Sequence, residues 1–104
     1  MSTTAIAAVT PRQRTTVRGE IVSVLSYGRP WVRTDAEVTD GTGSVLLRFL
    51  GRSGIPGLVA GCQIMAEGTP GFVRGALVML NPRYSLTGTA DRQPPAGNRC
   101  PGRS

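Results

Sequence analysis

The residues of this chain best suited to chemistry lie in one aromatic and basic run, residues 27–33 (YGRPWVR). The run holds two of the five aromatic residues of the chain. Bases of single-stranded nucleic acid stack on aromatic rings, while arginine pairs with phosphate or stacks in turn. Tyr27, Arg29, Trp31 and Arg33 are therefore candidate binding residues. The structural alternative is that Trp31 caps a hydrophobic core and Tyr27 packs beneath it.

A second aromatic and basic pair, Phe72 and Arg74, lies in the short run FVRG at 72–75. We expect this run at the tip of a hairpin, where an aromatic ring beside an arginine can stack on a base. The alternative is an ordinary turn in which Phe72 is partly buried.

Arg48 is the remaining candidate, on an alternating segment that follows the turn at 40–43. If Thr39 pairs with Ser44 across that turn, Asp35 lies opposite Arg48. Opposite charges at this cross-strand spacing stabilise a sheet by roughly a few tenths of a kcal/mol. The pairing favours a structural role for Arg48, and it neutralises the face that a phosphate would approach.

The composition excludes most catalytic chemistry. All twelve basic residues are arginine, so the chain has neither lysine nor histidine. It therefore lacks a P-loop lysine, a Schiff-base amine, an imidazole base and a histidine-ligated zinc, and two cysteines are too few for a zinc site. The only clustered acids are Asp35, Glu37 and Asp40, and no pocket is implied around them. We expect a protein that is not an enzyme and that binds no metal or other cofactor.

The net charge of +6 is unevenly distributed, because the short segments 1–15 and 87–104 carry +2 each, as much as the whole of residues 16–86, so two thirds of the charge lies in the tails. Residues 16–86 carry seven arginines against five acids, so this central segment is only mildly basic. Residues 1–15 are rich in Ser, Thr and Ala before they become basic, and we expect a disordered arm there. Residues 87–104 are rich in Pro, Gly and Arg and predict a disordered tail. The folded domain is expected over 16–86.

That domain has the pattern of five short β-strands separated by turns. The strands are expected over 17–25, 31–39, 44–50, 62–73 and 76–80. Gly19 inside the first strand predicts a bulge or a sharp bend. The segment 51–61 holds four glycines and one proline and cannot form more than a turn of helix, although Ile55 and Leu58 could plug the end of a barrel. A closed barrel suits such strands because closure removes exposed edges.

The runs VRGEIVSV, DGTGSVLLRFLG, GIPGL and LNPRY resemble the OB-fold family of the tRNA anticodon-binding-like type, in particular small actinobacterial OB-fold nucleic-acid-binding proteins. The chain is also similar to the wedge OB domain of the RecG helicase. The resemblance covers about residues 16–86. It implies an all-β, five-stranded Greek-key OB-fold barrel with a reduced or absent helix between strands 3 and 4. It also implies binding on the outer face of strands 2 and 3, framed by the loops between strands 1 and 2 and between strands 4 and 5.

The leading hypothesis is weak, sequence-tolerant binding of single-stranded DNA or RNA. The candidate residues are Tyr27, Arg29, Trp31, Arg33, Arg48, Phe72 and Arg74. The alternative is a protein-interaction OB module accessory to a larger complex, which the nearly neutral face of strands 2 and 3 favours. We expect a monomer in the cytoplasm, because no targeting signal is visible. We expect no membrane association, because the longest apolar stretch, 76–80, is far too short for a membrane span.

Overall fold

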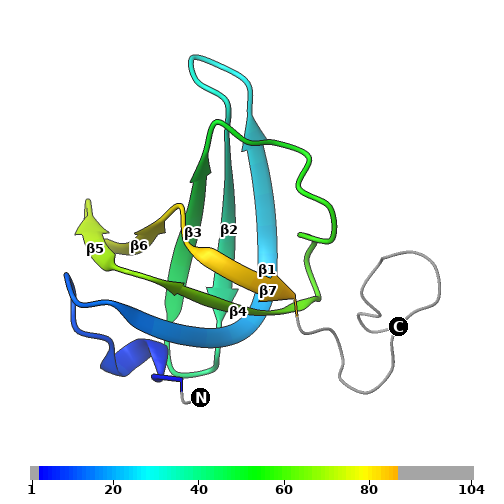
Figure 1. The fold of residues 1–104 in the computed structure, drawn as a ribbon. Helices are drawn as coiled ribbons and strands as arrows, with labels where there is room; N and C mark the ends of the chain where they lie inside the picture. The colour runs from blue at the N-terminus through cyan, green and yellow to red at the C-terminus, as the bar shows by residue number, and fades with distance from the viewer. Residues whose placement is uncertain (1–2, 87–104) are drawn as a thin grey trace.

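In the computed structural model, which describes residues 3–86, seven β-strands form one sheet in the order β5-β6-β3-β2-β1-β4-β7 (Figure 1). The strands are β1 (Thr15–Tyr27), β2 (Arg33–Thr39), β3 (Ser44–Leu50), β4 (Gln63–Gly68), β5 (Pro70–Val73), β6 (Ala76–Leu80) and β7 (Arg83–Leu86). Only Thr69 separates β4 from β5, and only Asn81 and Pro82 separate β6 from β7. Each of these pairs is one bent strand, so five chain segments build the barrel. The all-β, five-stranded prediction is confirmed, and the segment between β3 and β4 contains no helix.

The first strand belongs to both halves of the barrel. β1 pairs with β4 over residues 15–20 and with β2 over residues 20–27, so it is longer than the predicted strand at 17–25. Gly19 lies at this change of partner, and a Cβ there would clash with the backbone carbonyl of Thr39. Glycine therefore permits an approach between β1 and β2 that no other residue allows.

The hairpin of β2 and β3 has the predicted register. Thr39 lies opposite Ser44, and Asp35 lies opposite Arg48. β2 begins at Arg33 rather than at the predicted residue 31, so more of the aromatic and basic run lies in the loop before it.

The turn of this hairpin is held by the carboxylate of Asp40. Asp40 Oδ1 accepts hydrogen bonds from the hydroxyl of Thr42 at 2.6 Å and from the backbone N–H of Thr42 at 2.8 Å. Its Oδ2 accepts from the N–H of Ile6 at 2.9 Å. Burial of the carboxylate alone would raise its pKa, but the hydrogen bonds from Thr42, Ile6 and Gly43 outweigh that effect and lower the pKa of Asp40 to about 2.

The N-terminal segment differs from the prediction of a disordered arm over 1–15. Its described part forms a 3₁₀ turn, Ile6–Ala8, and Ile6 is only 4% exposed within the core. The segment is ordered because its apolar side chain fills the barrel and Asp40 binds its backbone. The folded unit thus extends to the N-terminal side of residue 16, whereas the predicted tail at 87–104 lies outside the described residues. No helix within residues 3–86 has the length and apolar character to cross a membrane.

The core lies inside the barrel, and strands β1, β2, β3, β4 and β6 all contribute side chains to it. The strand residues of the hydrophobic core cluster are Val17, Ile21, Ala36, Val38, Val45, Leu47, Phe49, Ile64, Ala66 and Met79. Phe49 meets Tyr84 edge to face, with 5.3 Å between ring centroids. Ile55 and Leu58 are buried against the same cluster from the loop between β3 and β4, as predicted. They supply from an irregular loop the apolar surface that a helix would otherwise provide.

Candidate functional site

The two loops that carry candidate residues lie toward opposite ends of the β2–β3 hairpin. The loop between β1 and β2 leads into Arg33, which pairs with Leu50 at the end of β3. The turn between β5 and β6 lies toward the start of β3, because β6 runs parallel to β3 with Leu46 opposite Val78. In Figure 1 the first loop is at the top of the barrel and the β5–β6 turn is at its left. At a rise of about 3.4 Å per residue, the length of β3 places these two ends about 20 Å apart.

The β1–β2 loop brings four predicted residues together. Trp31 is 75% exposed, so the alternative that it caps the core is wrong. Tyr27 is 37% exposed at the end of β1, and the guanidinium of Arg33 lies 4.5 Å from the centroid of its ring. Tyr27, Arg29, Pro30, Trp31 and Arg33 line a shallow pocket of about 100 Å³. The loop therefore presents a stacking surface beside cationic groups.

The β5–β6 turn carries the other aromatic and basic pair. Val73 pairs with Ala76, so Arg74 and Gly75 form a two-residue turn. Both have positive φ, 52° at Arg74 and 83° at Gly75, as a type I′ hairpin turn requires. Phe72 is 63% exposed, which is more than the partly buried alternative implied. The ring and the guanidinium are thus both accessible at the tip.

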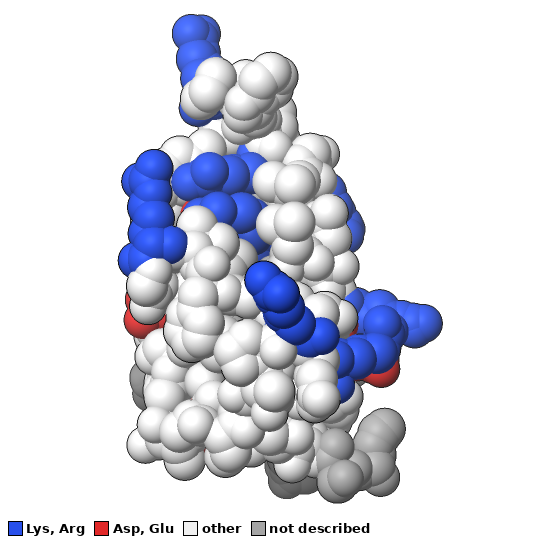
Figure 2. Space-filling model, turned by 90° about the vertical axis from the view of Figure 1, so that its left-hand side faces the viewer, with Lys and Arg blue, Asp and Glu red and all other residues white. Residues whose placement is uncertain are grey.

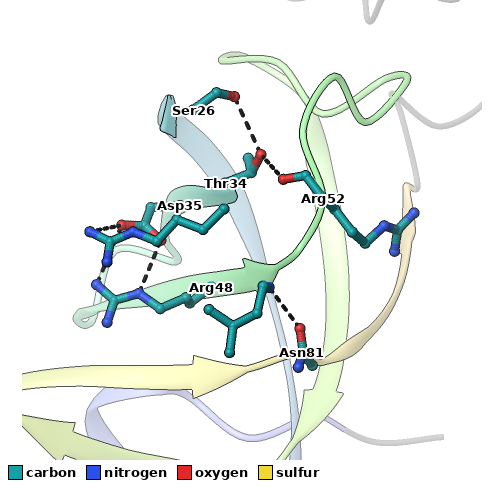
Figure 3. A network of polar contacts seen from close by, with 8 residues as sticks. Ser26, Thr34, Asp35, Arg48, Arg52 and Asn81 are labelled. Atoms are coloured by element: carbon teal, nitrogen blue, oxygen red, sulfur yellow. Dashed lines mark hydrogen bonds and ion pairs between the residues drawn. The ribbon is translucent and has the colours of Figure 1, made fainter. Parts of the chain in front are cut away.

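The outer face of β2 and β3 carries an arginine–aspartate cluster in which Asp35 contacts both Arg33 and Arg48. Figure 3 shows the contacts of Asp35 with Arg48. Arg48 binds Asp35 twice, through Nε to Oδ1 at 3.1 Å and through Nη2 to Oδ2 at 3.3 Å. Nη2 of Arg33 lies 3.4 Å from the same Oδ2. Because two guanidinium groups cover it, Asp35 is only 6% exposed although it points away from the core. The predicted pairing is present, and Arg48 has the structural role that this pairing favours.

A second polar network positions the end of β3, and sequence reasoning missed it. The buried hydroxyl of Thr34 donates to the carbonyl of Arg52 at 2.8 Å and shares a hydrogen bond with the Ser26 hydroxyl at 3.3 Å (Figure 3). Asn81 Oδ1 accepts from the N–H of Leu50 at 2.9 Å. Two features of the sequence could have indicated this network. Thr34 is a polar residue at an inward position of an alternating run, and Asn81 precedes a proline, a context typical of a turn. Asn81 has a positive φ of 45°, which asparagine tolerates better than most residues.

The charged side chains on the side of the barrel that carries β5 are dispersed. Figure 2 views the side of the barrel that carries β5, where basic side chains form separate groups on a largely uncharged surface. Among the described residues, Arg29, Arg52 and Arg74 form no ion pair, so their charges remain available to a ligand. Glu37 is exposed, whereas the carboxylates of Asp35 and Asp40 are held by different partners.

A scan against models of protein families finds no match, and neither does a search of curated proteins. Among solved structures, the chain is similar to OBody AM1L10, an engineered OB-fold scaffold, bound to hen egg-white lysozyme. The two chains share 19% sequence identity with a TM-score of 0.66. The match covers 86% of this chain and 96% of the OBody chain. A likeness at this identity shows the fold alone, and the fold is that of an OB-fold barrel.

Proposed function

We propose that this OB-fold module binds single-stranded DNA or RNA, weakly and with little sequence preference, across the outer face of β2 and β3. The observation that carries the proposal is how the five aromatic residues are divided. Phe49 and Tyr84 pack against one another at the core. Tyr27, Trp31 and Phe72 are exposed, and all three lie at the two loops that frame this face.

The exposed rings, and the arginines that form no ion pair within residues 3–86, complement the two parts of a nucleotide. A base stacked on an aromatic side chain contributes about 1–3 kcal/mol and is accepted whatever its identity. Arg29 lines the same pocket as Trp31, and Arg74 lies two residues from Phe72. Each loop thus offers one stacking surface and one cation for the adjoining phosphate.

The separation of the loops sets an expected length for the ligand. Stacked nucleotides rise by about 3.4 Å each, so a strand needs about six of them to span about 20 Å. This length falls within the range of about 4–16 nucleotides that single OB folds occupy. We expect affinity to rise with oligonucleotide length up to about six nucleotides and then to level off.

Fluorescence of Trp31, the only tryptophan of the chain, tests the proposal directly. Titration with oligothymidylates of increasing length is expected to quench Trp31 and to show the plateau in affinity. The variant Trp31→Phe keeps an aromatic surface and is the matched control for Trp31→Ala, with binding followed on a labelled oligonucleotide. Unchanged Trp31 fluorescence at saturating oligonucleotide would contradict the proposal.

A second candidate, a protein-interaction module, is supported by the arginine–aspartate cluster and its surroundings. Asp35 offsets part of the positive charge of Arg33 and Arg48, and Leu50 and Leu80 are exposed near them. A nearly neutral, partly apolar face of this kind suits a protein surface. This candidate replaces the first if oligonucleotides neither quench Trp31 nor bind the loops.

A further inference from the structure

The arginine–aspartate cluster is asymmetric, and the asymmetry separates two arginines that look equivalent in sequence. Arg48 has two hydrogen bonds to Asp35, one to each carboxylate oxygen. Arg33 has a single, longer contact of 3.4 Å to Oδ2, which forms an ion pair without a well-formed hydrogen bond. Asp35 is therefore neutralised mainly by Arg48.

The side chain of Arg33 also has an unused hydrogen-bond donor. Its Nε is buried and has no hydrogen-bond partner within the described residues. Such a donor is unfavourable unless an acceptor reaches it. The same guanidinium stacks on Tyr27 and lines the pocket of the β1–β2 loop, so a small rotation would turn it toward a ligand there.

We infer that Arg33 exchanges Asp35 for a phosphate of the bound strand, while Arg48 stays on Asp35 and compensates the negative charge of that carboxylate. The inference rests on the proposed function and assigns different roles to the two residues. Arg33 contacts the ligand, and Arg48 is a positioning residue that acts through Asp35. Asp35 competes with the ligand for Arg33 and thereby limits its affinity.

The different roles of Arg33 and Arg48 follow from the contacts that remain when Arg48 is removed, alone or together with Asp35. Without Arg48, Arg33 is the only cationic partner of the Asp35 carboxylate among the described residues, and moving it away would leave that charge unpaired, which is unfavourable. Arg33 would then remain on Asp35. Without both Arg48 and Asp35, Arg33 has no competing partner and is again available to the phosphate.

Four variants and one probe, a labelled hexathymidylate, test the inference. Arg33→Gln should weaken binding about tenfold, because one charge-assisted contact is lost. It should also make the slope of log affinity against log salt less negative by about 0.7. Arg48→Gln should reproduce both changes. The double variant Asp35→Asn with Arg48→Gln should return to within about twofold of the wild-type affinity.

The fourth variant, Asp35→Asn alone, frees both arginines and should strengthen binding, with a slope more negative by about 0.7. It keeps the test usable if Arg48→Gln does not fold. Its control is Glu20→Gln, which removes one negative charge from β1, outside the face of β2 and β3 that the strand is proposed to cross. Glu20 is exposed and forms no ion pair with the described residues, so we expect less than about a twofold change there.

Two results would overturn the inference while leaving the proposed function intact. If the double variant binds as weakly as Arg48→Gln, Arg48 contacts the phosphate itself. If Arg33→Gln binds like the wild type, Arg33 has only a structural role in the sheet and does not contact the ligand. Failure of the wild-type protein to bind hexathymidylate instead contradicts the proposed function, and the inference falls with it.

Discussion

At the scale of single residues, exposure separates side chains of the same chemical type. Phe49 is buried and contributes to the core, whereas Phe72, at the β5–β6 tip, is exposed. The same contrast divides the arginines, since Arg48 is paired with Asp35 while Arg74 has no ion pair among the described residues. Substitutions at the exposed members should therefore change binding, and they should change stability only where the residue has an unfavourable backbone conformation, as Arg74 does.

Trp31→Ala is the first test of that separation. Because Trp31 is largely exposed, we expect the free energy of unfolding to change by no more than about 0.5 kcal/mol. Oligonucleotide binding should weaken by about 1–3 kcal/mol through the loss of one stacked base. Thermal melting and titration of a labelled oligonucleotide measure the two effects. A loss of stability of about 3–5 kcal/mol would instead be the signature of a core residue.

Arg74→Asn should show a trade-off between stability and binding. A positive φ is unfavourable for arginine, and asparagine tolerates it better, so the variant should gain about 0.5–1 kcal/mol of stability. It should also bind single strands less tightly, because an accessible cation is removed. Arg29→Asn is the control: it removes a loop cation at a residue without positive φ, so it should weaken binding with no gain in melting temperature.

At the scale of elements, two devices hold the strands in place. Gly19 lets β1 pass close to β2 where it changes partner, and Asp40 ties the β2–β3 turn to the N-terminal segment. Both devices act through contacts between residues that are distant in sequence. Their loss should destabilise the barrel whatever its ligand.

Gly19→Ala should destabilise the protein by at least about 2 kcal/mol, because the added methyl group clashes with the backbone of Thr39. Gly28→Ala is the matched control, since a Cβ at Gly28 meets nothing within 4 Å. Urea denaturation of both variants provides the comparison. Equal midpoints would show that β1 does not need this close approach.

Asp40 should make stability depend on pH at the acidic end. Its pKa in the folded protein, about 2, lies below the ordinary value of 3.8, so the unfolded chain binds this proton more readily. The stabilisation is complete above about pH 4 and is lost as the pH falls toward 2. Allowing for solvent screening, it amounts to about 1 kcal/mol.

Urea denaturation at a series of pH values measures this contribution. Asp40→Asn should lower stability near neutral pH and flatten the change between about pH 4 and pH 2. Glu37→Gln makes the same carboxylate-to-amide change at an exposed position and should keep that dependence. An unchanged profile in Asp40→Asn would mean that other groups produce the acid response.

At the scale of the whole molecule, net charge could imitate specific binding. Residues outside the barrel strands carry part of the charge of +6, including Arg92, Arg99 and Arg103 beyond the described residues. Electrostatic attraction of this kind is sequence-independent and falls with salt. The loops and the terminal arginines must therefore be separated by experiment.

The salt dependence of binding distinguishes the contribution of the loops from that of the terminal arginines. Contacts from Arg29, Arg33 and Arg74 predict a slope of about −2 for log affinity against log salt, at about 0.7 per phosphate contact. Replacing Arg92, Arg99 and Arg103 with serine should leave most of this slope. If the slope vanishes in that variant, the terminal arginines bind the nucleic acid and the barrel is better understood as a protein-interaction module.

Local signals in the sequence determined the β2–β3 hairpin, the absence of a helix over 51–61 and the grouping of aromatics with arginines in two loops. A turn motif and a period-two alternation specify a register within a few residues, which is why Asp35 could be placed opposite Arg48. The glycines of 51–61 exclude a helix in the same local way.

Only the tertiary structure decided where Ile6 and Trp31 lie and which arginine Asp35 holds. Ile6 is ordered by a hydrogen bond to Asp40, 34 positions away, and no local pattern encodes such a contact. Trp31 is equally compatible with a core and with a loop until the packing around it is known. The two hydrogen bonds of Arg48 and the single contact of Arg33 depend on side-chain geometry across two strands, which residue spacing does not specify.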